Sequence, residues 1–135
     1  MLSDNVLSML RAARAAEKQQ ALFYRALSAI AEERALGPDI EALNGLLADE
    51  QHHLSRISVR LVELGYEIGD AGTDVPECDF AEWRTTARER ERAEIERYET
   101  LLKQALDRET AQILRGILAV EREHERNLGG KYTEA

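Results

Sequence analysis

The sequence carries one arrangement of polar residues twice, once in each half of the chain. In each half a glutamate stands seven positions before a tyrosine, and a Glu-x-x-His motif follows. The residues concerned are Glu17, Tyr24, Glu50 and His53 in the first half, and Glu91, Tyr98, Glu121 and His124 in the second. The glutamate and tyrosine pairs lie 74 positions apart and the Glu-x-x-His motifs lie 71 apart. The second half of the chain therefore repeats the complete four-residue pattern of the first half.

The distribution of helix-breaking residues indicates four helices. The two prolines are Pro38 and Pro76, and most of the glycines lie in the breaks between long segments or near a terminus. The long segments are rich in alanine, leucine, glutamate and arginine, which favour helices. Their apolar residues recur at spacings of three and four, as on one face of a helix. We predict an all-α fold, an antiparallel four-helix bundle that forms one domain over residues 1–135.

Local signals predict where each helix begins and ends. The expected helices span residues 3 or 4 to 33, 38 to 64, 79 onward, and 107 to the Gly129-Gly130 pair. Gly37-Pro38 separates the first two helices, and Gly65 is expected to cap the second. Asp79 begins the third helix with Glu82 completing a capping box, and Asp107 caps the fourth. Segment 65–78 is the long connection, and it can cross the bundle between two helical hairpins.

The spacing along the helices places the repeated residues at one level. Glu91 and Glu121 both lie roughly 20 to 25 Å from the bend near Asp107, at about 1.5 Å per residue. The distances of Glu17 and Glu50 from the first bend agree less closely, and a short loop can make up the difference between them. One layer across the bundle is therefore expected to hold Glu17, Glu50, His53, Glu91, Glu121 and His124.

Such a layer predicts a metal site. Four ionised glutamates in an apolar core would be strongly destabilising unless their charge were neutralised. Two divalent cations would balance them, and the two imidazoles would bind as neutral nitrogen ligands. A glutamate and a histidine three apart on a helix point to the same side, so one cation can bind both. Mixed carboxylate and imidazole ligation suits iron or manganese. We predict two metal ions, iron or manganese, and a metal-free bundle with solvated glutamates is the other interpretation.

Several neighbours of these residues allow two interpretations. Glu94 lies one helical turn after Glu91 and can replace or supplement it as a ligand, although the repeat favours Glu91. His52 also has an acidic residue three positions earlier, but its helical neighbours are polar or small, so we expect it to face solvent. Tyr24 and Tyr98 are either hydrogen-bond donors to ligand carboxylates or ordinary core aromatics.

Composition excludes several classes of function. The net charge of −8, without a clustered basic face, argues against nucleic acid as a partner. No apolar run approaches the roughly 20 residues that a bilayer span requires, so we expect a soluble chain without a membrane role. Cys78 is the only cysteine, which excludes a Cys-x-x-Cys metal site and points to the cytoplasm.

At these residues the chain resembles the ferritin-like superfamily, and within it the rubrerythrin-type di-iron domain. The likeness is carried by residues 16–24, 49–53, 91–98 and 120–124. The resemblance implies that the six layer residues bind iron, with Glu50 and Glu121 as bridging carboxylates. It also implies a reaction of the iron pair with hydrogen peroxide or dioxygen.

The chain departs from the family in two ways. Rubrerythrins usually carry a second, four-cysteine iron domain, which is missing here, so turnover would need an external electron donor. Cage-forming ferritins are usually longer and often end in a fifth helix, so a homodimer is expected rather than a cage.

These observations leave several hypotheses for function. The leading one is a cytoplasmic di-iron oxidoreductase, a peroxidase or ferroxidase of the rubrerythrin-like kind. The alternatives are an iron-binding or iron-storage protein without turnover, and a metal-free helical interaction module. A di-iron hydroxylase acting on an organic substrate also remains open, because fold alone does not choose among activities.

Overall fold

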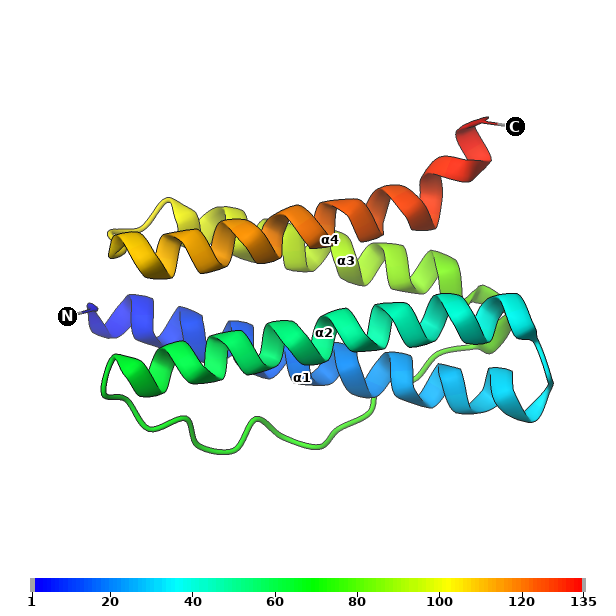
Figure 1. Ribbon diagram of the computed structural model, residues 1–135, viewed down its shortest axis with the longest axis horizontal. Helices are drawn as coiled ribbons and strands as arrows, with labels where there is room; N and C mark the ends of the chain where they lie inside the picture. The colour runs from blue at the N-terminus through cyan, green and yellow to red at the C-terminus, as the bar shows by residue number, and fades with distance from the viewer. Residues whose placement is uncertain (1, 135) are drawn as a thin grey trace.

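The protein folds as a four-helix bundle, as predicted. The structure, a computed structural model, describes residues 2–134, with side chains described up to residue 129. The elements in chain order are α1 (Asp4–Glu33), α2 (Gly37–Glu63), the short 3-10 helix η1 (Phe80–Glu82), α3 (Trp83–Leu102) and α4 (Arg108–Glu134). In Figure 1, α1 and α2 form one antiparallel hairpin, and α3 and α4 form the other alongside it. Within residues 2–134 no helix combines the length and the apolar character that crossing a membrane requires.

The connection between α2 and η1 follows the side of the bundle from one end to the other (Figure 1). Two arginines of α1 hold its first part in place. Arg11 donates a hydrogen bond to the Glu67 carbonyl at 2.7 Å, and Arg14 donates to the carbonyls of Ile68 and Gly69 at 2.9 and 3.2 Å. Because this segment spans the bundle, α3 starts at the end where α2 began, and the hairpins pack with α1 against α3 and α2 against α4.

The helix ends follow the local signals in three places. The Ser3 side chain caps α1 by accepting a hydrogen bond from the Val6 amide at 3.1 Å. Gly65 adopts a positive φ of 88° after α2, and the Tyr66 amide bonds back to the Leu61 carbonyl at 2.9 Å, which is the expected C-terminal cap. Asp107 caps α4 by accepting from the Thr110 amide at 2.9 Å.

Three boundary predictions need correction. After α1 the left-handed residue is Ala35, with φ 54°, while Gly37-Pro38 only opens α2. At the third helix Asp79 accepts from the Ala81 amide, and the Glu82 amide bonds to the Asp79 carbonyl, so this turn is a 3-10 helix and not a capping box. The fourth helix continues through Gly129-Gly130 to residue 134. Glycine costs a helix about 1 kcal/mol, which disfavours helix but does not end it.

The apolar core is divided into two clusters. One contains Leu10, Ile57, Leu61, Leu101 and Leu114. The other, toward the opposite end of the bundle, contains Phe23, Leu27, Leu43, Trp83 and Leu128. Tyr98 belongs to the first cluster and Tyr24 to the second. Along every helix the layer of buried glutamates and histidines lies between these two sets of residues.

Candidate metal centre

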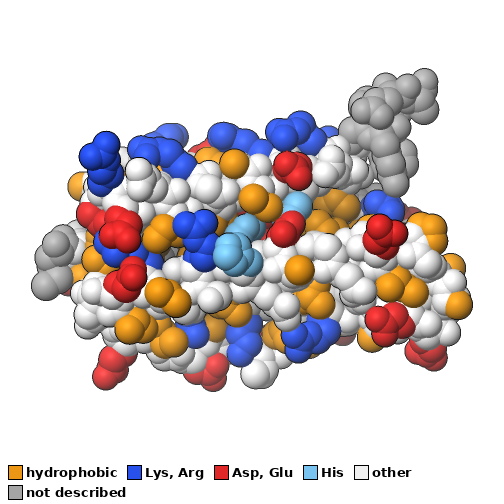
Figure 2. Space-filling view, viewed as in Figure 1, with side chains coloured by type: hydrophobic (Ala, Val, Ile, Leu, Met, Phe, Trp, Pro, Cys, Tyr) orange, Lys and Arg blue, Asp and Glu red, His pale blue; other side chains and the backbone are white. Residues whose placement is uncertain are grey.

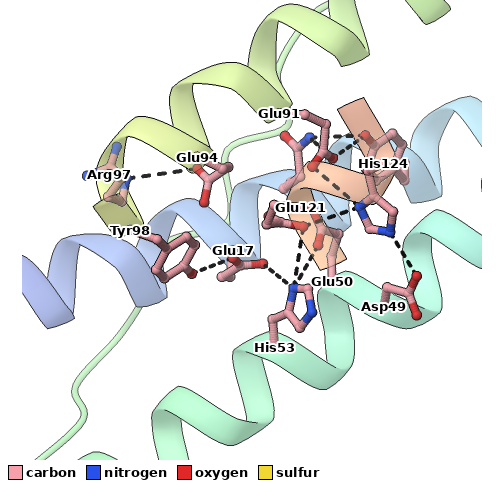
Figure 3. A network of polar contacts seen from close by, with 12 residues as sticks. Glu17, Asp49, Glu50, His53, Glu91, Glu94, Arg97, Tyr98, Glu121 and His124 are labelled. Carbon is pink, nitrogen blue, oxygen red and sulfur yellow. Dashed lines mark hydrogen bonds and ion pairs between the residues drawn. The ribbon is translucent and has the colours of Figure 1, made fainter. Parts of the chain in front are cut away.

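The six repeated residues converge on one place inside the bundle. Glu17 comes from α1, Glu50 and His53 from α2, Glu91 from α3, and Glu121 and His124 from α4. All four glutamates are 0 % exposed, and the two histidines are 2 % and 5 % exposed. Figure 3 shows the side chains pointing toward one another from the four helices. The structure thus brings together the six residues that the sequence pattern placed in one layer.

Their ligand atoms form two overlapping groups. In one group, atoms of Glu17, Glu50, His53 and Glu121 lie within 4.8 Å of one another. In the other, the same holds for Glu50, Glu91, Glu121 and His124. Glu50 and Glu121 belong to both groups. This is the arrangement that two cations sharing two bridging carboxylates require.

Each histidine turns its Nδ1 atom toward the carboxylates. His53 Nδ1 lies 3.1 Å from Glu50 Oε1 and 3.6 Å from an oxygen of both Glu17 and Glu121. His124 Nδ1 lies 3.2 Å from Glu121 Oε1 and 3.3 Å from Glu91 Oε1. In both Glu-x-x-His motifs the same ring nitrogen therefore faces the glutamate of its own motif.

Many polar atoms in this layer have no hydrogen-bond partner among the described residues. They are Glu17 Oε1, both carboxylate oxygens of Glu50, His53 Nδ1 and both carboxylate oxygens of Glu121. Buried polar atoms in native proteins are normally hydrogen-bonded, so such a concentration needs an explanation. Oxygen and imidazole nitrogen atoms are the ligands of iron, manganese and zinc, and they converge here in two groups of four. The residues present therefore fit a pair of divalent cations.

The pKa values of the buried groups reflect the excess of carboxylates over positive charges in this layer. Burial, with the repulsion from Glu17 and Glu91, raises the pKa of Glu50 well above its ordinary value. Burial likewise raises the pKa of Glu121 to about 9, even though His124, 3.2 Å away, opposes the rise. Burial lowers the pKa of His124, but bonds to Glu121 and Glu91 outweigh it and raise that pKa to about 11. Without cations the layer therefore holds protons.

Each of the two tyrosines donates a hydrogen bond to a glutamate in the other half of the repeat. The Tyr24 hydroxyl in α1 donates a hydrogen bond to Glu91 Oε2 in α3 at 2.6 Å. The Tyr98 hydroxyl in α3 donates to Glu17 Oε2 in α1 at 2.5 Å. Both tyrosines are 0 % exposed and also pack in the apolar clusters. Each tyrosine is thus a core aromatic residue and also a hydrogen-bond donor to one of the buried glutamates.

Glu94 lies beside the layer and not within it. It is 6 % exposed, its Oε1 lies 3.9 Å from Arg97 Nε, and its Oε2 has no hydrogen-bond partner among the described residues. Burial and the nearby Glu17 raise its pKa to about 8. Neither group of ligand atoms includes it, so Glu91 occupies the position that the repeat assigned to it. His52 is exposed, as expected.

Sequence reasoning missed two residues that support the layer. Asp49 Oδ2 lies 2.8 Å from His124 Nε2 and so orients the ring whose other nitrogen faces the carboxylates. Gln20 donates from Nε2 to Glu91 Oε2 at 3.1 Å. The repeat contained a signal for Gln20, because it occupies the position equivalent to Glu94. The contact of Asp49 crosses from α2 to α4 and has no counterpart in the other half, where the equivalent residue is Val120.

Solvent approaches the layer from two opposite sides. Between α2 and α4 a pocket of about 260 Å³ is lined by Asp49, Glu123 and His124, among others. Figure 2 shows histidine and acidic side chains near the middle of this face. Between α1 and α3 a pocket of about 150 Å³ is lined by Gln20, Glu94 and two arginines, Arg90 and Arg97. The centre is therefore buried but lies beneath surface pockets on both sides.

Comparison with solved structures finds a similar fold. The structure described as "Chlorobium tepidum Ferritin" is 25% identical in sequence, with a TM-score of 0.82. The match covers 97% of this chain and 84% of that chain. No protein-family model matches the sequence, and no curated protein matches it. The similarity supports a ferritin-like four-helix bundle over nearly the whole chain.

Proposed function

We propose that this ferritin-like protein is a di-iron carboxylate oxidoreductase of the rubrerythrin-like kind, acting on hydrogen peroxide or dioxygen. The observation that carries the proposal is the sharing of Glu50 and Glu121 between two groups of buried ligand atoms. A single cation would need only one of these groups of ligand atoms. Two cations held by shared carboxylates can act together on one small oxidant.

In this proposal each cation has its own terminal ligands. Glu17 and His53 hold one, Glu91 and His124 hold the other, and Glu50 and Glu121 bridge them. Four carboxylates then balance two divalent cations, so the buried centre is close to neutral. Ferrous ions would supply the two electrons that reduce peroxide to water. Manganese, which accepts the same ligand types, stays the alternative.

The surrounding residues orient the ligands and hold protons. The hydroxyls of Tyr24 and Tyr98 each donate to one terminal glutamate, which favours its ionised form. Asp49 accepts from His124 Nε2, which leaves Nδ1 as the ligand atom. Without cations, Glu94 has a pKa of about 8 and holds a proton at neutral pH beside Glu17, and it lines the pocket between α1 and α3. It is placed to give that proton to an oxygen leaving the centre.

The proposed function also needs a source of electrons. Cys78 is the only cysteine of these 135 residues, so the bundle itself offers no four-cysteine iron site to supply electrons to the centre. We propose an external electron donor, a homodimer and a cytoplasmic setting.

The test is anaerobic titration with ferrous iron, followed by hydrogen peroxide. We expect two irons per chain and an absorbance in the near ultraviolet when peroxide is added. Glu50→Ala combined with His53→Ala should abolish both. His52→Ala is the matched control, since it removes the neighbouring, exposed histidine and should behave as the wild type. Equal iron content in the wild type and the double variant would refute the proposal.

Iron storage is the second candidate, favoured by the similarity to a structure described as a ferritin. The same ligands would then oxidise iron only as the first step of mineral formation. Light scattering distinguishes the two, because a large hollow assembly favours storage while a dimer that turns over with peroxide favours the enzyme. An interaction module without metal would be favoured if protein purified without added metal contained none and bound none.

A further inference from the structure

The two halves of the centre differ at one buried position. Gln20 stands three residues after Glu17, and Glu94 stands three residues after Glu91. The 74-residue repeat therefore places an amide in one half where the other half has a carboxyl group. Both side chains are buried, at 1 % and 6 % exposed. An amide always carries two N–H donors, whereas a carboxyl group carries at most one O–H donor, so the two halves are chemically unequal.

Arg90 fixes the orientation of the Gln20 amide. Arg90 Nε donates a hydrogen bond to Gln20 Oε1 at 2.7 Å. A guanidinium group has only donors, so the amide must turn its oxygen toward Arg90 and its nitrogen toward the interior. The arginine is itself held over the ring of Phe23, 4.9 Å from its centroid. The direction in which Gln20 donates is therefore determined by its neighbours.

The Gln20 amide in turn holds Glu91. Its Nε2 donates to Glu91 Oε2 at 3.1 Å and to the Tyr24 hydroxyl at 3.2 Å, while Tyr24 donates to the same Oε2. Two hydrogen bonds thus fix one oxygen of Glu91. The other, Oε1, faces His124 Nδ1 at 3.3 Å. Glu91 is held in one orientation with one oxygen directed at the centre.

The ligands of the other half are held less firmly. Tyr98 donates to Glu17, but Glu94 takes the place of Gln20, so this half has no amide donor at that position. Glu17 Oε1 and Glu94 Oε2 have no hydrogen-bond partner among the described residues. His124 has Asp49 on its outer nitrogen, whereas no described side chain is seen to orient His53 in that way.

We propose that Gln20, oriented by Arg90, is a positioning residue that makes the two cation sites unequal, so that the site of Glu91 and His124 fills first. This inference rests on the proposed two-metal centre. The ligands of that site are ordered in the folded protein before a cation arrives. Glu17 and His53 must lose more freedom when they bind, which weakens their site.

The test is a titration of the metal-free protein with cobalt(II), followed by calorimetry and by visible absorption. The wild type should bind two cobalt ions in two resolved steps. Gln20→Met keeps the length of the side chain but removes its donors, and should weaken the first step about 10- to 100-fold while leaving the second unchanged. Gln19→Met makes the same change at the neighbouring exposed position and should match the wild type. Arg90→Met, which leaves Gln20 in place but free to turn, should weaken the same step by a smaller factor.

A crystal structure with less than one cobalt per chain identifies the site by anomalous scattering. Cobalt at Glu91 and His124 supports the inference. Cobalt at Glu17 and His53 overturns it, as do two equal steps in the wild type or a Gln20→Met variant that binds as the wild type does. If the wild type binds no cobalt at all, the two-metal centre itself is refuted together with the inference. If two ions bind but Gln20→Met has no effect, only the inference fails.

Discussion

Tyr98 in α3 donates its hydroxyl hydrogen bond to Glu17 in α1, so a buried glutamate of the first hairpin is oriented by a side chain of the second. Tyr24 and Glu91 make the reverse contact, from α1 to α3. Each hairpin therefore orients one buried glutamate of the other. This reciprocity is the structural form of the repeat seen in the sequence.

Replacing Tyr98 with phenylalanine should weaken cation binding at Glu17 and His53. The change removes the hydrogen bond to Glu17 Oε2, which is worth about 1.5 to 3 kcal/mol when the acceptor is charged. We expect a weaker second step in the cobalt titration and an unchanged first step. Tyr66→Phe, which alters a half-buried tyrosine outside the centre, controls for loss of a hydroxyl. Tyr98→Phe protein that binds both ions as tightly as the wild type would contradict this role.

Replacing Asp49 with asparagine should weaken the other site. Asp49 is the only described side chain that contacts His124 Nε2, and it holds the ring with Nδ1 toward the centre. Loss of such a partner typically lowers metal affinity 10- to 100-fold. The measurement is competition for cobalt with a chelator of known affinity. Glu41→Gln changes another acidic residue of the same pocket that touches no ligand, and it should leave the affinity unaltered.

Metal-free protein should become less stable as pH rises. In the folded state the pKa of Glu121 is raised to about 9, that of Glu94 to about 8 and that of His124 to about 11. A group whose folded pKa is raised contributes stability below its unfolded pKa and loses it as pH rises through the folded value. Urea unfolding in the presence of a chelator should therefore give a lower free energy of unfolding at pH 9 than at pH 6.

Cation loading should remove most of that pH dependence. The cations take the place of the protons in neutralising the carboxylates, so their binding tightens as pH rises and releases protons. Calorimetry in two buffers of different ionisation enthalpy measures that release. Binding without proton release would show that the buried carboxylates are not where the cations bind.

Asp107 should stabilise the start of α4 independently of the centre. Its side chain accepts from the Thr110 amide at 2.9 Å and lies 2.7 Å from Arg60. Asp107→Ala should cost about 1 kcal/mol of unfolding free energy, typical of a lost N-cap. Asp107→Asn should retain most of the cap. Cation binding should not change in either variant.

The contribution of the Asp107 charge should depend on pH. Hydrogen bonds to Thr110 and Arg60 outweigh burial and lower the pKa of Asp107 to about 2. The contribution of the charge to stability is therefore present above about pH 4 and declines as pH falls toward 2.

The helices and the six layer residues could be predicted because both follow from spacing along a single helix. A glutamate and a histidine three apart share a face wherever the helix packs. In a bundle with a polar layer, the two faces of this kind meet the glutamates of the other two helices. Gln20 and Asp49 could not be predicted in the same way. Their partners lie on other helices, at Glu91 and His124, and that pairing depends on which hairpin faces which.

The helix ends show the same distinction between features that local sequence determines and features that it does not. Ser3, Gly65 and Asp107 act through their own turn of chain, and local sequence was sufficient to predict them. Ala35 takes the left-handed conformation although alanine disfavours it, and α4 continues through two glycines. In both places the backbone departs from the preference of the local residues, which sequence alone does not reveal.

Because each group of ligand atoms draws on both hairpins, neither half of the chain contains a complete site. A fragment that ends before η1 keeps Glu17, Glu50 and His53 but lacks Glu121, and the complementary fragment lacks Glu50. The two copies of the motif therefore do not form two independent groups of ligand atoms. They form one pair of overlapping groups that exists only while the two hairpins are packed together, and a cation bound there would oppose their separation.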